Sequence, residues 1–396
     1  MGKSLLGKVL YCVTLLALLW YCIVGIQNKT IYTDELRSDR ISLFVLLGLL
    51  VISLFYFKGT NKKNQFTSSY IYLIVYIYGI SVLHSIVNPS DLIRYVTMAL
   101  PIMMFMFSRN SFNTISSSNE GQLFFLVSLV VLTYYYFNAQ LQNSRLESFD
   151  YFHSNSSYYL LYLLPLLLCN KRELIRWAAL LVTAIAIFSS TKRGGAIAFV
   201  LGLLIYVYTR YFVVSTRRSR FSGTLFSIVV VGLILFVTVS YWGESVDVVI
   251  DRIENNNDAG GRGRLTIYTT VVNMIVQSSP LNILFGHGWN QVIVDNPIGL
   301  SAHNDFLECI YDFGIIGLFL FLAYVFNMIK YTFHLLKEKS SIGPAMAVAV
   351  IIFLVNSSVS HILIYPAFAM QFALFFGYVI GNQEFHSATG SRVIVP

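Results

Sequence analysis

The residues best suited to acid/base chemistry stand together in the segment 301–308, which reads Ser-Ala-His-Asn-Asp-Phe-Leu-Glu. At the start of a helix, Asp305 or Glu308 would come within reach of His303 and could orient its imidazole. An imidazole held in this way accepts or releases a proton near neutral pH. We therefore predict an acid/base site formed by His303, Asp305 and Glu308. The simpler alternative is an ordinary helix N-cap at Asn304 or Asp305.

A metal site is the other chemistry that His303 and its acidic neighbours allow. Zinc-binding histidines commonly stand in pairs at helical spacing, whereas the segment around His303 holds one histidine. We therefore predict that the site holds no metal.

Two basic segments could bind an anion, and the first is 260–265. It reads Gly-Gly-Arg-Gly-Arg-Leu, which predicts a glycine-rich turn that opens a helix. Free N–H groups at a helix start and the guanidinium groups of Arg262 and Arg264 together favour an anion, for which phosphate is the natural choice. The alternative is a flexible loop with two solvated arginines.

The second basic segment, 189–194, joins the end of one apolar run to the start of the next. Its Lys192 and Arg193 stand on the acidic, external side of the topology predicted below, which indicates a function. They could also be interfacial residues whose charges simply reach water. Arg94, near the start of another apolar run, is costly unless it faces a cavity or a partner such as Asp91. Further polar candidates on this side are His84, Arg145, His153, Asn155, His287 and His361.

Membrane helices must position these residues. Of the 396 residues, 56% are hydrophobic and 12% are charged, and the mean hydropathy is +0.67. So few charges cannot cover a soluble surface. We therefore predict an all-α integral membrane protein with about 12 transmembrane helices. Apolar runs long enough to span a bilayer begin near Leu5, Ile41, Tyr70, Leu92, Leu123, Tyr158, Leu174, Ala196, Phe226, Ile315, Ala345 and Pro366.

The charges of the loops predict the orientation in the membrane. Basic residues gather in alternate loops, at Arg109 and within 58–63, 171–176, 210–220 and 330–339, and nearly all acidic residues lie on the opposite side. The positive-inside rule then places both termini in the cytoplasm and the candidate site on the external face. The net charge of +8 is a topology signal on this interpretation, and it does not indicate a nucleic-acid partner.

This topology divides the chain into three parts. Residues 1–243 contain transmembrane helices 1–9, residues 244–314 form a large periplasmic loop, and residues 315–396 contain helices 10–12 with a short cytoplasmic tail. A loop of about seventy residues is long for an unstructured connection, so we predict that it is folded. Its apolar pattern predicts a short amphipathic helix over 265–276 that lies on or dips into the membrane.

Three stretches of sequence resemble, in order and spacing, the O-antigen ligase and O-antigen polymerase superfamily. They read SSTKRGGAIAFVLGLLIYV, then GGRGRLTIYTTVVNMIV followed by FGHGWNQV, then SAHNDFLECIYDFGIIGLFLFL, within roughly residues 154–331. The resemblance implies a GT-C-like fold in the bacterial inner membrane. It also implies an enzyme that moves glycans from undecaprenyl diphosphate at the periplasmic face.

The resemblance assigns roles to individual residues. Arg193 matches the family's serine–arginine element, and Arg264 matches its R-L-x-x-W element, in which Tyr268 replaces the tryptophan. These arginines are implied to hold the lipid diphosphate, with Lys192 and Arg262 as neighbouring candidates. His303 matches the family's histidine–asparagine element, which is implied to lie at the transfer site.

We therefore expect an inverting, metal-independent glycosyltransferase of lipopolysaccharide or other surface-polysaccharide biosynthesis, with no cofactor. The expected partners are the lipid-linked glycan, membrane lipid, an acceptor that is either a glycan or the lipid A core, and a chain-length regulator. A polymerase is preferred to a ligase because surface-glycan gene clusters commonly carry their own polymerase. A transporter or flippase is the alternative from another class, and it would require ionisable residues or broken helices at the bilayer midplane.

Overall fold

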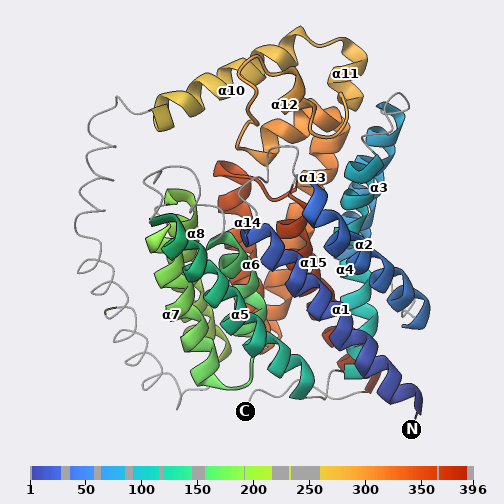
Figure 1. Ribbon diagram of the computed structural model, residues 1–396, viewed down its shortest axis with the longest axis vertical. Helices are drawn as coiled ribbons and strands as arrows, with labels where there is room; N and C mark the ends of the chain where they lie inside the picture. The colour runs from blue at the N-terminus through green and yellow to red at the C-terminus, as the bar shows by residue number, and fades with distance from the viewer. Residues whose placement is uncertain are drawn as a thin grey trace.

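The fold is all-helical wherever the structure describes it. The computed structural model describes residues 2–27, 36–57, 64–84, 92–115, 119–144, 157–190, 192–215, 232, 259–363 and 365–389, and these ranges contain no strand. Figure 1 shows long helices side by side in a bundle, with α10 (Ala259–Gln277), α11 (Pro280–Phe285) and α12 (Gln291–Asp295) gathered at one end. This confirms the predicted fold class of an all-α membrane protein.

The helices of the bundle follow the apolar runs of the sequence. They are α1 (Gly2–Gln27), α2 (Leu36–Tyr56), α3 (Gln65–His84), α4 (Leu92–Ile115), α5 (Asn119–Ser144), α6 (Ser157–Leu168), α7 (Glu173–Ser189), α8 (Arg193–Val207) with its π-helical continuation η2 (Tyr208–Val214), α13 (Asp305–Lys337), α14 (Gly343–Val359) and α15 (Pro366–Thr389). A helix therefore covers each predicted run except the one from Phe226, which lies outside the described residues.

Four of the described helical segments are long and apolar enough to cross a membrane. They are Leu5–Val24, Gln65–His84, Gly194–Val214 and Asp305–Lys337. Helix α6 is shorter, at 12 residues, and it is buried along its whole length. It therefore meets protein rather than lipid. The number of about 12 spans, the orientation and the positions of the termini stay predictions.

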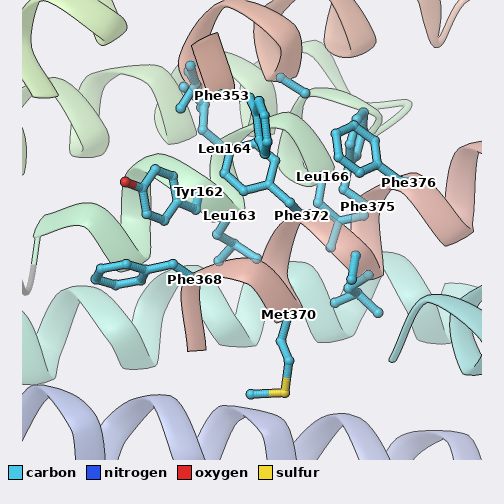
Figure 2. Close-up of a cluster of buried hydrophobic side chains, with 14 of the residues drawn as sticks. Tyr162, Leu163, Leu164, Leu166, Phe353, Phe368, Met370, Phe372, Phe375 and Phe376 are labelled. Atoms are coloured by element: carbon cyan, nitrogen blue, oxygen red, sulfur yellow. The ribbon is translucent and has the colours of Figure 1, made fainter. Parts of the chain in front are cut away.

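Aromatic and aliphatic side chains of α6, α14 and α15 fill the centre of the bundle. Figure 2 shows Tyr162 among Phe353, Phe368 and Phe372. The ring of Tyr162 lies 4.9 Å from Phe368 and 5.1 Å from Phe372, and Phe353 meets Phe372 edge to face at 5.5 Å. Offset and edge-to-face aromatic pairs of this kind stabilise a core beyond the burial of their area.

A buried ion pair joins α4 to α15. The guanidinium of Arg109 contacts the Glu384 carboxylate twice, with Nη2–Oε1 at 2.6 Å and Nε–Oε2 at 3.1 Å. Two parallel bonds fix both side chains. On the same pair of helices, a Cβ at Gly377 would collide with the carbonyl oxygen of Phe105, so the two backbones approach closely there. The sequence analysis placed Arg109 in a basic loop, and this is wrong because Arg109 lies inside α4.

The segment before α13 is folded from Ala259 onwards. It contains α10 (Ala259–Gln277), α11 (Pro280–Phe285) and α12 (Gln291–Asp295). Helix α10 begins earlier than the predicted start at residue 265, so the predicted glycine-rich turn over 260–264 is wrong, and these glycines lie in the first turns of α10. Residues 244–258 of the predicted loop lie outside the described residues.

Asp312 attaches this segment to α13. Its buried carboxylate accepts hydrogen bonds from the N–H groups of Asn290, at 2.7 Å, and Val292, at 3.0 Å. The chain also crosses itself at Gly286 and Gly314, whose φ angles are 88° and 68°. A Cβ at either glycine would collide with backbone atoms of the other chain segment at the crossing. Only glycine fits such a crossing.

We predict that Gly314→Ala destabilises the protein by roughly 1–3 kcal/mol, because φ 68° and ψ −172° are almost exclusive to glycine and the new Cβ would strike Leu284. Gly299→Ala is the matched control, since Gly299 has a similar φ of 67° but open space around its Cβ position. Thermal unfolding in detergent should show the larger loss for Gly314→Ala. Equal losses would contradict the close backbone crossing.

Candidate functional site

The site begins with the cap of α13. The side-chain Oδ1 of Asn304 accepts hydrogen bonds from the N–H groups of Phe306, at 2.9 Å, and Leu307, at 3.1 Å. Its Nδ2 donates to the carbonyl oxygen of Ser358 at 3.0 Å. Asn304 therefore starts α13 and ties that start to the end of α14. The N-cap alternative of the sequence analysis is confirmed for Asn304, and the cap leaves the neighbouring side chains free for other roles.

His303 precedes this cap in a left-handed backbone conformation, with φ of 52°. Positive φ is uncommon for a residue with a side chain, and such strain often accompanies functional sites. The ring of His303 lies 4.5 Å from the ring of His361, centroid to centroid, with the planes tilted by 35°. His361 comes from the short connection between α14 and α15.

The two carboxylates predicted to serve His303 contact the His361 connection. Glu308 Oε1 lies 3.2 Å from His361 Nδ1. Asp305 accepts hydrogen bonds from the N–H of Ile362, at 3.0 Å and 3.2 Å to its two oxygens. The other nitrogen of His361, Nε2, lies 2.9 Å from Ser301 Oγ. The two ring nitrogens of His361 thus face Glu308 and Ser301, and its ring lies beside that of His303.

Sequence reasoning assigned no role to His361. It was one of several polar candidates, and no motif marks it, because it lies far along the chain from the segment 301–308. Of the other candidates, His287 stacks on Tyr311 at 4.1 Å. It therefore attaches the connection between α11 and α12 to α13 and does not belong to the site. Arg145, His153 and Asn155 lie outside the described residues.

The start of α8 reaches the same region through two glycines. A Cβ at Gly194 would lie 2.7 Å from the side chain of Val359, and one at Gly195 would lie 2.9 Å from that of Tyr158. The first turn of α8 therefore packs closely against the end of α14. Lys192, the residue before this turn, lies close enough to His361 for its charge to act on that ring.

Two cations act on the histidines. The charges of Arg264 and Lys192 both lower the pKa of His303 and of His361. Burial, and then the charge of Arg264, lower the pKa of Lys192 to about 8. Two basic segments far apart in the sequence thus converge on His303. Arg264 is exposed and Lys192 is partly buried, so an anion has access to both.

Burial is the main influence on the two imidazoles. It lowers the pKa of His303 to about 3, with smaller contributions from His361, Arg264 and Lys192. It lowers the pKa of His361 to about 4, and Asp305 opposes this shift. Both rings are therefore neutral at physiological pH. A neutral ring can accept a proton, and it does not compete with the cations for an anion.

The remaining predicted anion ligands can be placed only by their backbone. Arg193 is the first residue of α8, Arg262 lies in the first turn of α10, and Arg94 lies in the first turn of α4. Their side chains lie outside the described part of the structure. The site as described thus combines two neutral imidazoles, two cations and two buried carboxylates at one end of the bundle.

Comparison with protein families agrees with this picture. Residues 178–322 match the family model described as O-antigen ligase, and no curated protein matches the chain. The matched region includes Lys192, Arg264 and His303, whereas His361 lies beyond its end. Residues 178–322 are thus similar to the O-antigen ligase family, in agreement with the resemblance of the sequence.

Proposed function

We propose that this membrane protein transfers an oligosaccharide from undecaprenyl diphosphate to a sugar hydroxyl at the periplasmic face of the inner membrane. The observation that carries the proposal is that Lys192 and Arg264 both act on a half-buried, neutral His303 within the family-matched region. Cations beside a proton acceptor suit a reaction in which an anion leaves as a hydroxyl attacks.

The cations would stabilise the leaving group. When the bond between the anomeric carbon and the diphosphate oxygen breaks, negative charge grows on the diphosphate. Lys192 and Arg264 would neutralise it, joined by Arg193 and Arg262 from the same helix starts and by Arg94. Charge-assisted bonds from guanidinium and ammonium groups in a partly dry site are strong enough to do this without a metal at the diphosphate.

The histidine would serve the acceptor. In a single displacement, the acceptor hydroxyl oxygen bonds to the anomeric carbon while its proton passes to a nitrogen of His303. The diphosphate leaves from the opposite side, so the configuration at the carbon is inverted. Asp305 and Glu308 would assist indirectly, because both contact the connection that carries His361, the ring neighbour of His303.

The acceptor decides between two versions of this reaction. A second lipid-linked glycan would make the protein a polymerase, working with a chain-length regulator, and the lipid A core would make it a ligase. We prefer the polymerase for the genomic reason given above. The description of the matching family as O-antigen ligase keeps the ligase as the second candidate.

We predict that Arg264→Ala and His303→Ala abolish glycan display in a deletion strain, because they remove a diphosphate cation and the proton acceptor. Lipopolysaccharide or capsule ladders measure this loss, and the amount of each variant in the membrane is checked in parallel. Core with one repeat unit identifies a polymerase, whereas bare core with accumulated lipid-linked polymer identifies a ligase. The matched controls Arg172→Ala and His334→Ala, at exposed positions on other helix ends, should keep full ladders. Full ladders from the site variants would overturn the proposal.

We predict that the affinity of the protein for undecaprenyl diphosphate, the leaving group, falls as pH rises through about 8. Lys192 is charged below that pKa and neutral above it, so its attraction for the diphosphate is present at lower pH and lost at higher pH. Lys192→Arg keeps its charge and should abolish this step. Binding of undecaprenyl diphosphate to purified protein in detergent, followed between about pH 6 and 10, measures it. If the Lys192→Arg variant shows the same loss of binding near pH 8, the pH dependence belongs to a group other than Lys192.

A further inference from the structure

Three buried ionisable side chains meet beneath His303. Asp305 and Glu308 lie in the first turn of α13, and His361 lies in the connection between α14 and α15; their exposed fractions are 1%, 2% and 3%. One nitrogen or oxygen atom from each lies within 4.8 Å of the others. Two carboxylates buried this closely repel each other unless something of positive charge holds them together.

One polar atom in this cluster lacks a hydrogen bond. The buried Nδ1 of His361 has no hydrogen-bond partner among the described residues, whereas the Glu308 carboxylate faces the backbone N–H groups of Ala302 and His303. Leaving a buried ring nitrogen unsatisfied is costly. The separation of 3.2 Å between His361 Nδ1 and Glu308 Oε1 is close to the roughly 3.3 Å expected between two ligands on a tetrahedral ion with bonds of about 2.0 Å.

The outer contacts of these side chains also suit a metal. A histidine that binds a metal through one ring nitrogen usually makes a hydrogen bond with the other, which fixes its orientation. His361 Nε2 lies 2.9 Å from Ser301 Oγ, so Nδ1 is the nitrogen directed at the acids. The Asp305 oxygens accept from the N–H of Ile362, which orients the carboxylate and leaves further lone pairs on each oxygen.

We propose that Asp305, Glu308 and His361 bind a divalent cation of the zinc class. One imidazole nitrogen and two carboxylate oxygens are ligands that zinc accepts, whereas magnesium and calcium prefer oxygen alone. The two carboxylates balance the charge of the ion. The ion would hold the start of α13 to the α14–α15 connection, and it is separate from Lys192 and Arg264, the cations proposed for the diphosphate. The prediction of a site without a metal rested on one histidine, and the fold supplies a second.

We predict that protein purified in detergent after growth with zinc contains about one zinc ion per chain. Glu308→Gln should lower this content at least tenfold, because it removes a charged ligand without changing the shape. Glu338→Gln is the matched control, since Glu338 lies just past the end of α13, 3.4 Å from His334 in an exposed pair. Elemental analysis by mass spectrometry gives the metal content of each variant.

A second measurement needs no variant. A chelator should lower the melting temperature of the wild-type protein, and added zinc should restore it. Wild-type protein that stays below about 0.1 ion per chain after zinc loading, with no thermal shift, would overturn the proposal and show that protons hold the carboxylates instead. These readouts do not depend on transfer activity. A variant that binds no metal and still restores glycan ladders in the deletion strain would be consistent with the proposed transferase activity.

Discussion

The hydrogen bonds of Asn304 are the constraint on which the site depends. Its Oδ1 starts α13, and its Nδ2 holds that start against the end of α14. Asp305 adds a second link, because its carboxylate accepts from the N–H of Ile362 in the connection after α14. Together these bonds fix the first turn of α13 relative to that connection. They set the positions of His303, Asp305 and Glu308 relative to His361.

The two ends of the bundle use charge differently. At one end, Arg109 and Glu384 neutralise each other through two short bonds, and the pair is buried between two helices. At the other end, Lys192 and Arg264 act on two neutral histidines, and Arg264 is exposed. A buried and mutually satisfied pair contributes to packing. Cations that remain accessible are available to a ligand.

Much of the fold could be predicted from the sequence, because apolar runs of membrane length have few alternatives to helix. The convergence of Lys192 and Arg264 on His303 could be expected from family motifs, although their separation in sequence gives no geometry. The start of α10 was not predicted, because its glycines suggested a turn. The packing of Ile267 and Val271 against Val292 and Tyr311 outweighs the low helix propensity of these glycines.

His361 could not be predicted as a central residue of the site. It stands in a short connection with no motif, and its importance comes from the packing of α14 against α13. The same reason limits any estimate of metal binding from local spacing, since ligands brought together by tertiary structure leave no pattern. The predicted pairing of His303 with Asp305 and Glu308 did not anticipate His361, whose ring lies 4.5 Å from that of His303 and whose Nδ1 lies 3.2 Å from Glu308 Oε1.

The break at Gly314 divides α13 into two parts with separate attachments. The first part is held by Asp312 to α11–α12 and by Asn304 to α14, whereas the second continues as an apolar helix to Lys337. Spanning helices respond to a thinner or thicker bilayer by changing their tilt. Because the helical backbone is interrupted at Gly314, we expect a change in tilt of the second part to be absorbed there. The residues around His303 would then keep their arrangement in bilayers of different thickness.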